Sequence, residues 1–146
     1  MAEDPYNLQR FVTAQAPLYA TALRELQDGY KRSHWMWFIF PQLRGLGFSS
    51  TAQFYGLTGL DEARVYLDHE VLGPRLLDCT QAAVNTQAAS LRALFGSPDD
   101  LKFRSSMTLF DAVSPDAVFR QALDRWCDGQ PDDRTLSLLS TEAPAA

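Results

Sequence analysis

The spacing of apolar residues predicts a chain that folds mainly into α-helices. Between positions 19 and 30, four apolar side chains recur at intervals of four, three and four residues, which places them on one face of a helix that ends near Gly29. Comparable spacing, with residues that favour helix ends, predicts helices over 61–68, 73–85 and 91–95. No segment shows the alternation of polar and apolar residues that is typical of a half-buried strand.

Two further helices are predicted in the last third of the chain by a repeated start signal. Ser97-Pro98 and Ser114-Pro115 are each followed by aspartate. This pattern matches a serine N-cap, a proline in the first turn and an acid near the positive end of the helix dipole. The second of these helices should bury Trp126 in the core.

Residues 31–48 follow neither pattern. The apolar run from Trp35 to Phe40 fits a buried strand or a short core helix equally well, and Pro41 ends it in either case. We therefore expect a mainly α-helical fold, a compact single-domain bundle of about six helices with an irregular aromatic-rich segment at 31–48. Residues 1–140 should form this one domain, and the small and polar residues 141–146 should form a disordered tail.

The composition agrees with one ordinary globular domain and excludes several other classes. The 146 residues are 46% hydrophobic and 21% charged, which is too apolar for a disordered chain. No apolar run approaches the roughly 20 residues that span a bilayer, and the first residues show no signal-peptide pattern. We expect a cytoplasmic protein with no membrane association, whose two cysteines stay reduced.

Acidic and basic residues are distributed unevenly along the chain. The net charge of −5 argues against nucleic acid as a partner, because phosphate backbones repel an acidic protein. Two stretches, 29–60 and 101–110, nevertheless contain no acid. The cations within them are Lys31, Arg32, Arg44, Lys102 and Arg104. Two interpretations stay open: a chance clustering of solvated side chains, or convergence of the two stretches on one anionic group.

The segment KRSHWMWFIFPQ at 31–42 is the strongest candidate for a binding site. A core segment with cationic flanks would explain its aromatic residues, whereas its indole N–H, imidazole and amide groups are typical of a small-molecule cleft. Residues 99–110 either form a surface helix with a Met and Phe core stripe or contribute a second wall. The candidate ligand-binding residues are Arg32, Ser33, His34, Trp35, Trp37, Gln42, Lys102, Arg104 and Ser105.

Recognisable catalytic and cofactor motifs do not occur in the sequence. The two histidines have no second ligand at helical spacing, HExxH and paired CxxC motifs are absent, and the GLG at 45–47 is not part of a phosphate loop. We therefore predict no metal and no cofactor. No serine or cysteine has a base paired with it in the sequence, so the question of enzyme activity stays open.

Several strings resemble a bacterial family catalogued as domain of unknown function 1810. They include RSHWMWFIFPQ followed by GLG, YLDHEVLGPRL and DDLKFRSSMTLF, and the opening DPYNLQRFVTAQ matches as well. The resemblance covers about residues 4–140 and implies a small, mainly helical, single-domain protein. It implies no activity, cofactor or catalytic residue. Some relatives are labelled calpastatin, but the sequence contains no repeated protease-inhibitor segment.

These observations favour a small-molecule function. The best hypothesis is a protein or enzyme that binds a small anionic or nucleotide-like ligand in a cleft lined by RSHWMWFIFPQ and KFRSSMT. The alternative is a protein-interaction module with the same aromatic segment as its contact patch. Burial separates the two, because a cleft needs these side chains around a cavity and a patch needs them on the surface. The oligomeric state stays open.

Overall fold

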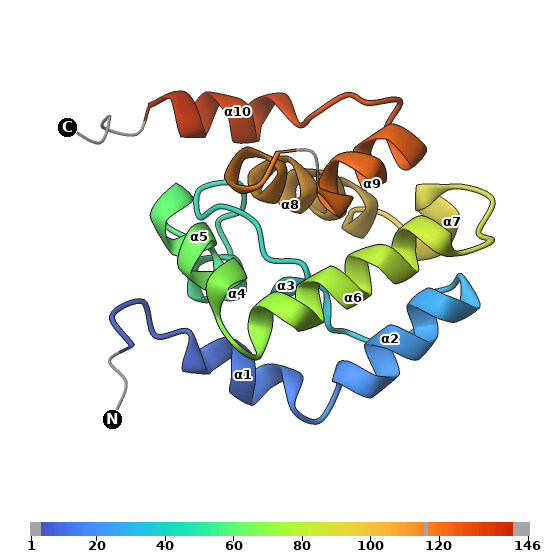
Figure 1. The fold of residues 1–146 in the computed structure, drawn as a ribbon, viewed down its shortest axis with the longest axis horizontal. Helices are drawn as coiled ribbons and strands as arrows, with labels where there is room; N and C mark the ends of the chain where they lie inside the picture. Colours follow the sequence, from blue (N-terminus) through green and yellow to red (C-terminus); the bar gives the residue numbers. More distant parts are fainter. Residues whose placement is uncertain (1–3, 116, 142–146) are drawn as a thin grey trace.

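The computed structural model describes residues 4–115 and 117–141, and these residues form ten helices (Figure 1). The prediction of a mainly helical fold is confirmed, although the number of helices is ten rather than about six. The helices are α1 Gln9–Gln15, α2 Tyr19–Asp28, α3 Met36–Ile39, α4 Ser50–Tyr55, α5 Leu60–Asp68, α6 Leu72–Asn85, α7 Leu91–Phe95, α8 Asp99–Val113, α9 Val118–Trp126 and α10 Asp133–Ser140.

Helices α6 and α8 lie at the centre of the single domain. Helix α6 packs against α2, α5 and α9, and α8 packs against α5, α7, α9 and α10 (Figure 1). The short helix α3 contacts α1, α4 and α8. Every long helix therefore buries one apolar face against another helix, which is how an all-helical domain forms its core.

Aromatic side chains join α3 and the residue after it to α7 and α8. The Phe40 ring meets the Phe103 ring edge-on with centroids 5.0 Å apart, and Phe95 stacks on Phe103 at 4.8 Å. The Trp35 ring lies 6.2 Å from both Phe40 and Phe95. Such pairs add specific geometry to the large apolar area that each ring buries. The aromatic run of the sequence is thus mainly core.

The segment 31–48 contains a helix and an extended stretch. The ambiguity between strand and helix at 35–40 is resolved as the single turn of α3. Beyond Pro41, the chain is extended and Leu43 forms an isolated parallel bridge with Leu57. The amide of Leu57 donates to the carbonyl of Gln42 at 2.9 Å, and the amide of Arg44 donates to the carbonyl of Leu57 at 2.8 Å. This bridge holds Gln42 in a fixed position beside α3.

The predicted ends of the helices before Gly29 and Gly96 are confirmed. Helix α2 ends at Gly29, whose φ of 80° is a left-handed conformation that glycine adopts at little cost. Helix α7 has the predicted bounds, and α6 begins one residue before the predicted 73.

The predicted serine caps of the last two long helices are wrong. Pro98 occupies the N-cap position of α8 without a side-chain hydrogen bond, and Asp100 accepts the amide of Leu101 instead. Ser114 is the C-cap residue of α8 rather than the start of the next helix, which begins at Val118. Asp116 lies outside the described residues. Ser97 lies in the turn between α7 and α8, and Ser114 ends α8, so neither serine is free to begin a helix.

Two further details differ from the sequence analysis. Trp126 is half-buried at the edge of the core instead of inside it, and its indole N–H donates to the carbonyl of Ala83 at 2.8 Å. Helix α4 was not predicted, although Ser49 caps it by accepting the amide of Ala52 at 3.1 Å. With only six residues and an exposed surface, α4 shows too little apolar periodicity to be recognised.

Among the described residues, no helix combines the length and apolarity that crossing a membrane requires. Apart from Thr141, the tail expected at 141–146 lies outside the described part of the chain. Both cysteines are free thiols.

Candidate functional site

The segment that carries most of the candidate residues is held in place by one buried carboxylate on α2. Glu25 accepts hydrogen bonds from the amides of Arg32 and Ser33, from the Ser33 hydroxyl and from the Trp35 indole N–H. Burial alone would raise the pKa of Glu25, but these donors outweigh it and lower the pKa to about 2. The carboxylate is therefore charged at neutral pH and fixes the chain between 32 and 35.

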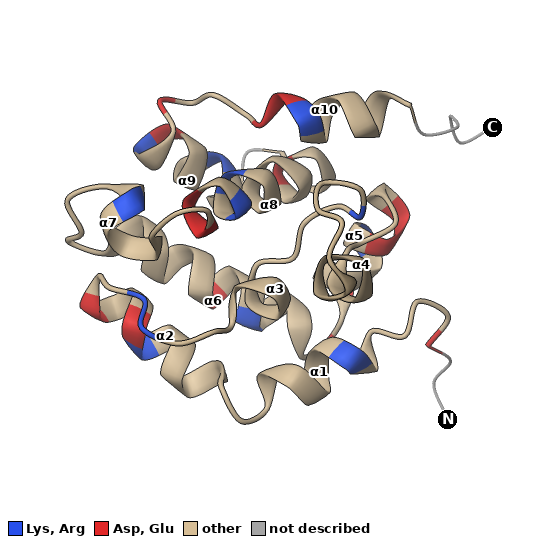
Figure 2. Cartoon of the chain, turned by 180° about the vertical axis from the view of Figure 1, so that it is seen from behind, with Lys and Arg blue, Asp and Glu red and all other residues tan. Residues whose placement is uncertain are grey.

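Beside this segment, two lysines share one aspartate at the start of α8. Lys31 Nζ lies 2.9 Å from Asp99 Oδ2, and Lys102 Nζ lies 3.3 Å from Asp99 Oδ1. The Lys102 ammonium also sits 3.8 Å from the centroid of the Trp37 ring. The two acid-free stretches of the sequence thus meet through Lys31, Trp37 and Lys102. Figure 2 views the molecule from the side on which α3 and α8 lie in front.

Three adjoining hollows share Trp37 and Lys102 as lining residues. The largest has a volume of about 320 Å³, and a second has about 140 Å³. The third is a narrow gap toward α4 that admits no water. The first hollow is lined by Trp37, Gln42, Leu46, Gly47, Pro98, Leu101, Lys102, Ser105, Asp132 and Arg134. The second is lined by Lys31, His34, Trp35, Met36, Trp37, Asp99 and Lys102. We call the first two hollows together the Trp37–Lys102 cleft.

Gln42 stands out among the groups that line the cleft. The residue is only 9% exposed, its amide still reaches the hollow, and within residues 4–115 and 117–141 no hydrogen bond engages that amide. Polar groups of nearly buried residues are usually hydrogen-bonded to protein, to water or to a bound molecule. The amide can both donate and accept toward the hollow.

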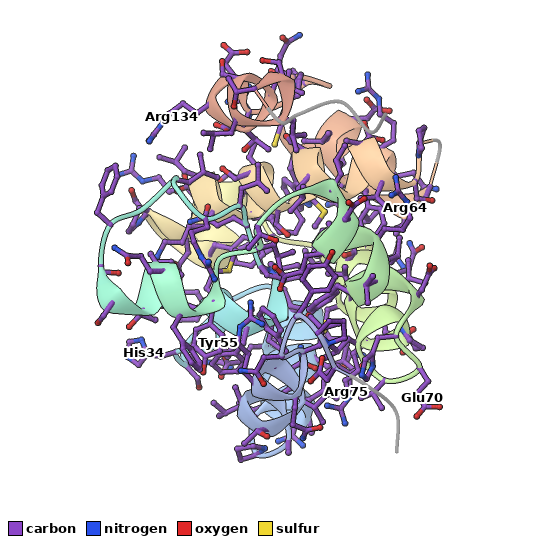
Figure 3. The ribbon with its side chains drawn as sticks, turned by 90° about the vertical axis from the view of Figure 1, so that its left-hand side faces the viewer. His34, Tyr55, Arg64, Glu70, Arg75 and Arg134 are labelled. Atoms are coloured by element: carbon purple, nitrogen blue, oxygen red, sulfur yellow. The ribbon has the colours of Figure 1, made fainter. Side chains whose placement is uncertain are left out.

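The far wall of the cleft comes from the chain just before and within α10. Thr108 on α8 accepts the amide of Asp132 at 2.8 Å, and Asp132 caps α10 by accepting from the amide and hydroxyl of Thr135. These bonds fix the first turn of α10, which carries Arg134. In the described residues Arg134 forms no hydrogen bond or ion pair. Figure 3 shows Arg134 and His34 on one side of the molecule, opposite Arg64 and Glu70.

The structure brings some of the candidate residues together and leaves others apart. His34, Trp35, Trp37, Gln42, Lys102 and Ser105 line the cleft. Arg32 does not line it; its guanidinium lies 3.6 Å from Asp28 on the exposed surface of α2. Ser33 is bound to Glu25, and Arg104 donates to the carbonyl of Gln130. Lys102 and Arg104 point in different directions, because side chains two positions apart on a helix are rotated by about 200° relative to each other.

The candidate residues from the sequence do not include four charged residues of the cleft, Lys31, Asp99, Asp132 and Arg134. Asp99 and Lys31 form its ion-pair network, and Arg134 faces the larger hollow. Lys31 lies in an acid-free stretch, so charge distribution gave a signal for it. Arg134 directly follows two aspartates in the sequence, so the charge distribution gave no signal for it.

The aromatic segment does not form an exposed patch. Trp35, Met36, Phe38 and Phe40 are buried, and Trp37 is half-buried. A contact patch needs apolar side chains on the surface. The burial pattern therefore gives no support to the alternative of a protein-interaction module built on this segment. Among the described residues, no group of three or more His, Cys, Asp or Glu side chains could hold a metal ion.

Comparison with known protein families shows to which family the chain belongs. A family model described as "Protein of unknown function (DUF1810)" matches residues 5–139. The chain belongs to the DUF1810 family. Its fold is similar to the crystal structure of the conserved hypothetical protein Rv1873 from Mycobacterium tuberculosis, with 50% sequence identity and a TM-score of 0.90. The match covers 95% of this chain and 100% of that one. No protein of curated function matches this DUF1810 member.

Proposed function

We propose that this DUF1810 protein binds a small anionic ligand in the Trp37–Lys102 cleft. The observation that carries the proposal is the amide of Gln42: the residue is only 9% exposed, the amide has no partner among the described residues, and it lines the largest hollow of the cleft. A ligand with hydrogen-bonding groups would satisfy that amide. Binding is the extent of the proposal, and no reaction is assigned.

The charge of the cleft favours an anion. Three cations, Lys31, Lys102 and Arg134, line it together with the carboxylates of Asp99 and Asp132. Asp132 is already occupied as the cap of α10, and Asp99 is shared between the two lysines. Arg134 is left with its full set of donors, which suit a carboxylate or phosphate in a bidentate arrangement. The cleft is therefore locally cationic in a protein whose net charge is −5.

The size and walls of the cleft favour a small ligand with an apolar part. A volume of about 320 Å³ lies at the lower end of the range for small-molecule sites. Trp37, Leu46 and Leu101 supply apolar surface around the polar groups. We expect the ligand to place its anionic group between Lys102 and Arg134 and its flat or apolar part against these side chains.

The test is a thermal-shift screen of nucleotides, sugar phosphates and organic carboxylates with four forms of the protein. They are the wild type, Lys102→Gln, Arg134→Gln and the control Arg64→Gln, whose exposed guanidinium pairs with Asp61 away from the cleft. A ligand at 100 times its Kd stabilises the folded state by about 2.7 kcal/mol, which a melting curve detects readily.

We expect a hit that stabilises the wild type and Arg64→Gln but not Lys102→Gln or Arg134→Gln. A fifth form, Gln42→Leu, should also lose the response while keeping a melting temperature near that of the wild type, because the amide makes no hydrogen bond within the described residues. Equal responses in all variants, or no stabilising anion in the panel, would contradict the proposal.

A further inference from the structure

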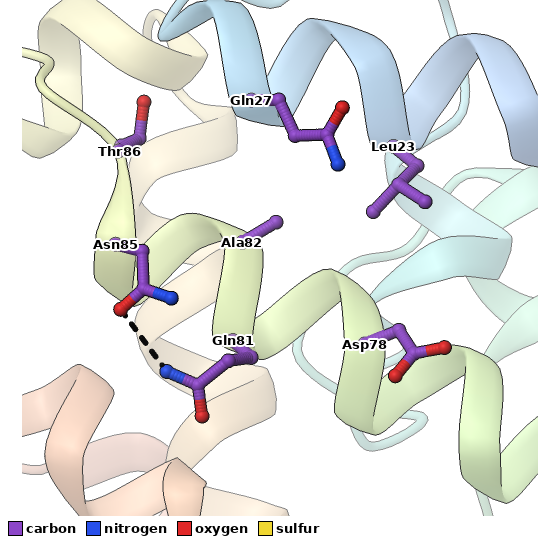
Figure 4. A pocket seen from close by; sticks show the side chains of 7 residues that line it. All are labelled: Leu23, Gln27, Asp78, Gln81, Ala82, Asn85 and Thr86. Atoms are coloured by element: carbon purple, nitrogen blue, oxygen red, sulfur yellow. Dashed lines mark hydrogen bonds between the residues drawn. The ribbon is translucent and has the colours of Figure 1, made fainter.

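A second hollow lies between α2 and α6, away from the Trp37–Lys102 cleft. It has a volume of about 480 Å³ and is lined by Leu23, Gln27, Asp78, Gln81, Ala82, Asn85 and Thr86 (Figure 4). Leu23 and Ala82 form its apolar floor, and the other side chains are polar. We call this hollow the α2–α6 groove.

The polar groups of the groove are one carboxylate, three side-chain amides and one hydroxyl. Gln81 donates to Asn85 at 3.1 Å, which leaves further capacity on both amides. Gln27 and Asp78 make no hydrogen bond or ion pair within the described residues. Lysine and arginine are absent from the lining. The groove therefore offers several acceptors and one uncompensated negative charge.

The two helices add to this negative potential because their C-terminal ends lie together. Gly29, directly after α2, lies against Thr86 and Ala88, which follow α6. The ends of the two helices lie side by side in the ribbon view (Figure 1). A helix C-terminus carries about half a negative charge, and a basic residue in the last turn normally compensates it. Neither α2 nor α6 has a basic residue in its last turn.

Two arginines on α6 and α9, Arg75 and Arg125, are engaged with other groups. Arg75, one turn before Asp78, places its guanidinium 4.8 Å from the Tyr19 ring and donates to Gln15. Arg125 donates to the carbonyl of Val84 from the α9 side of α6. Neither arginine lines the groove.

We propose that the α2–α6 groove binds a small organic cation that carries an amine or guanidinium group. Asp78 pairs with the charged group, the amides of Gln27 and Asn85 accept its remaining N–H donors, and Leu23 and Ala82 contact its carbon chain. The two helix ends favour the same charge. This site is independent of the anion site, since the two share no lining residue and prefer opposite charges.

The experiment is an NMR titration of the full chain with agmatine, which carries both an amine and a guanidinium, and with neutral 1,4-butanediol. We expect agmatine to shift the side-chain amide resonances of Gln27 and Asn85, and the diol to leave them in place. Asp78→Asn should weaken agmatine binding by about two- to fivefold, as expected when one member of an exposed charge pair is removed. Added salt should weaken binding in the wild type.

The control variant is Asp68→Asn, which changes the net charge equally at an exposed carboxylate at the end of α5. It should bind agmatine like the wild type. Because Asp78 is exposed, the Asp78→Asn protein should remain folded. The dispersion of its NMR spectrum checks this directly. Equal shifts with the diol, equal weakening in both variants, or no shift at Gln27 and Asn85 would overturn the proposal.

Discussion

The indole nitrogen of Trp35 donates a hydrogen bond of 3.0 Å to the carboxylate of Glu25, ten residues earlier in the chain. The same carboxylate accepts two amides and one hydroxyl from Arg32 and Ser33. An anion that accepts several N–H and O–H donors is strongly stabilised even without a cationic partner. Glu25 thus joins α2 to the segment in front of the Trp37–Lys102 cleft and fixes the start of α3.

The first prediction is that this carboxylate makes the protein sensitive to acid. The folded state lowers the pKa of Glu25 to about 2 from its ordinary value of 4.5. The stabilisation is therefore fully present above pH 4.5 and is lost as the pH falls from there toward 2. Over this pH range, the contribution of the Glu25 carboxylate to the free energy of unfolding falls by about 3 kcal/mol. Urea unfolding of the wild type at a series of pH values measures it.

Glu25→Gln should remove this part of the acid sensitivity. At pH 7 the substitution should lower the free energy of unfolding by about 2 kcal/mol. The NH₂ group of the glutamine would face N–H and O–H donors that now bind the carboxylate, so at least one hydrogen bond is lost. Glu70→Gln, on the exposed turn after α5, should leave the pH profile unchanged. A Glu25→Gln protein with the wild-type profile between pH 4.5 and 2 would show that other carboxyl groups cause the loss.

The sequence predicts the fold class because most helices carry their own local signals. The stripe ending at Gly29 and the apolar spacing of 73–85 depend on residues within one helix, and both segments form helices with nearly the predicted bounds. Ser97 and Ser114 show where local signals fail. A serine before a proline is a frequent N-cap, but here tertiary packing ends the preceding turn or helix at that position.

The candidate site is predicted less well, because its geometry depends on contacts between distant segments. Sequence analysis proposed that residues 31–42 and 101–110 meet, and the contact of Lys102 with Trp37 does join them. The sequence alone does not show that the Trp35 indole donates to Glu25, or that α10 brings Arg134 to the same cleft. These contacts involve sequence separations that no periodic pattern records.

The second prediction concerns the buried ion pair of Arg10 and Glu62. Their side chains are 5% and 2% exposed, with 3.0 Å between nitrogen and oxygen. Arg10 also donates to the carbonyl of Phe54, so it joins α1 to the end of α4 and to α5. Arg10→Met should lower the free energy of unfolding by about 3–5 kcal/mol, because it leaves a buried carboxylate without its cation.

Urea unfolding of Arg10→Met and of Arg64→Met compares a buried pair with an exposed one. Arg64 pairs with Asp61 at 3.3 Å, but both side chains are more than half exposed. Its replacement should cost at most about 1 kcal/mol. A similar cost for both variants would mean that water reaches Glu62 and that the pair around Arg10 contributes little.

The third prediction is that Gly73 tolerates no side chain. A Cβ atom added at Gly73 would lie 2.1 Å from the carbonyl oxygen of Leu67, where the first turn of α6 crosses the end of α5. Alanine normally stabilises a helix by about 1 kcal/mol relative to glycine. Here Gly73→Ala should instead cost at least about 2 kcal/mol, because backbone atoms must move to accommodate the methyl group.

Gly96→Ala separates this steric effect from backbone strain. Gly96 has a φ of 76°, and no atom lies within 4 Å of an added Cβ. Its replacement should cost about 1–2 kcal/mol through the left-handed backbone alone. Thermal or urea unfolding of the two variants should show the larger loss for Gly73→Ala. A neutral or stabilised Gly73→Ala protein would show that α5 and α6 can separate there at little cost.

The last prediction is that the two thiols react at very different rates. Cys79 is fully buried on α6, and burial raises the pKa of its thiol to about 12. Cys127 is half-buried after α9, and burial raises its pKa as well, to a lesser extent. The thiolate is the reactive species, so both thiols should react slowly at neutral pH and faster as the pH rises. Maleimide should modify Cys127 first, because Cys79 becomes accessible only when α6 opens.

Labelling of wild type and Cys127→Ser, followed by mass spectrometry, measures this difference. The wild type should take up one maleimide under native conditions and a second only in guanidinium. Native Cys127→Ser should take up none on the same timescale, and one after unfolding. Because α6 lies at the centre of the bundle, the protection of Cys79 reports the global stability of the fold, and destabilising changes such as Gly73→Ala should accelerate its labelling. Equal native rates for the two thiols would instead show that α6 opens locally while the rest of the domain stays folded.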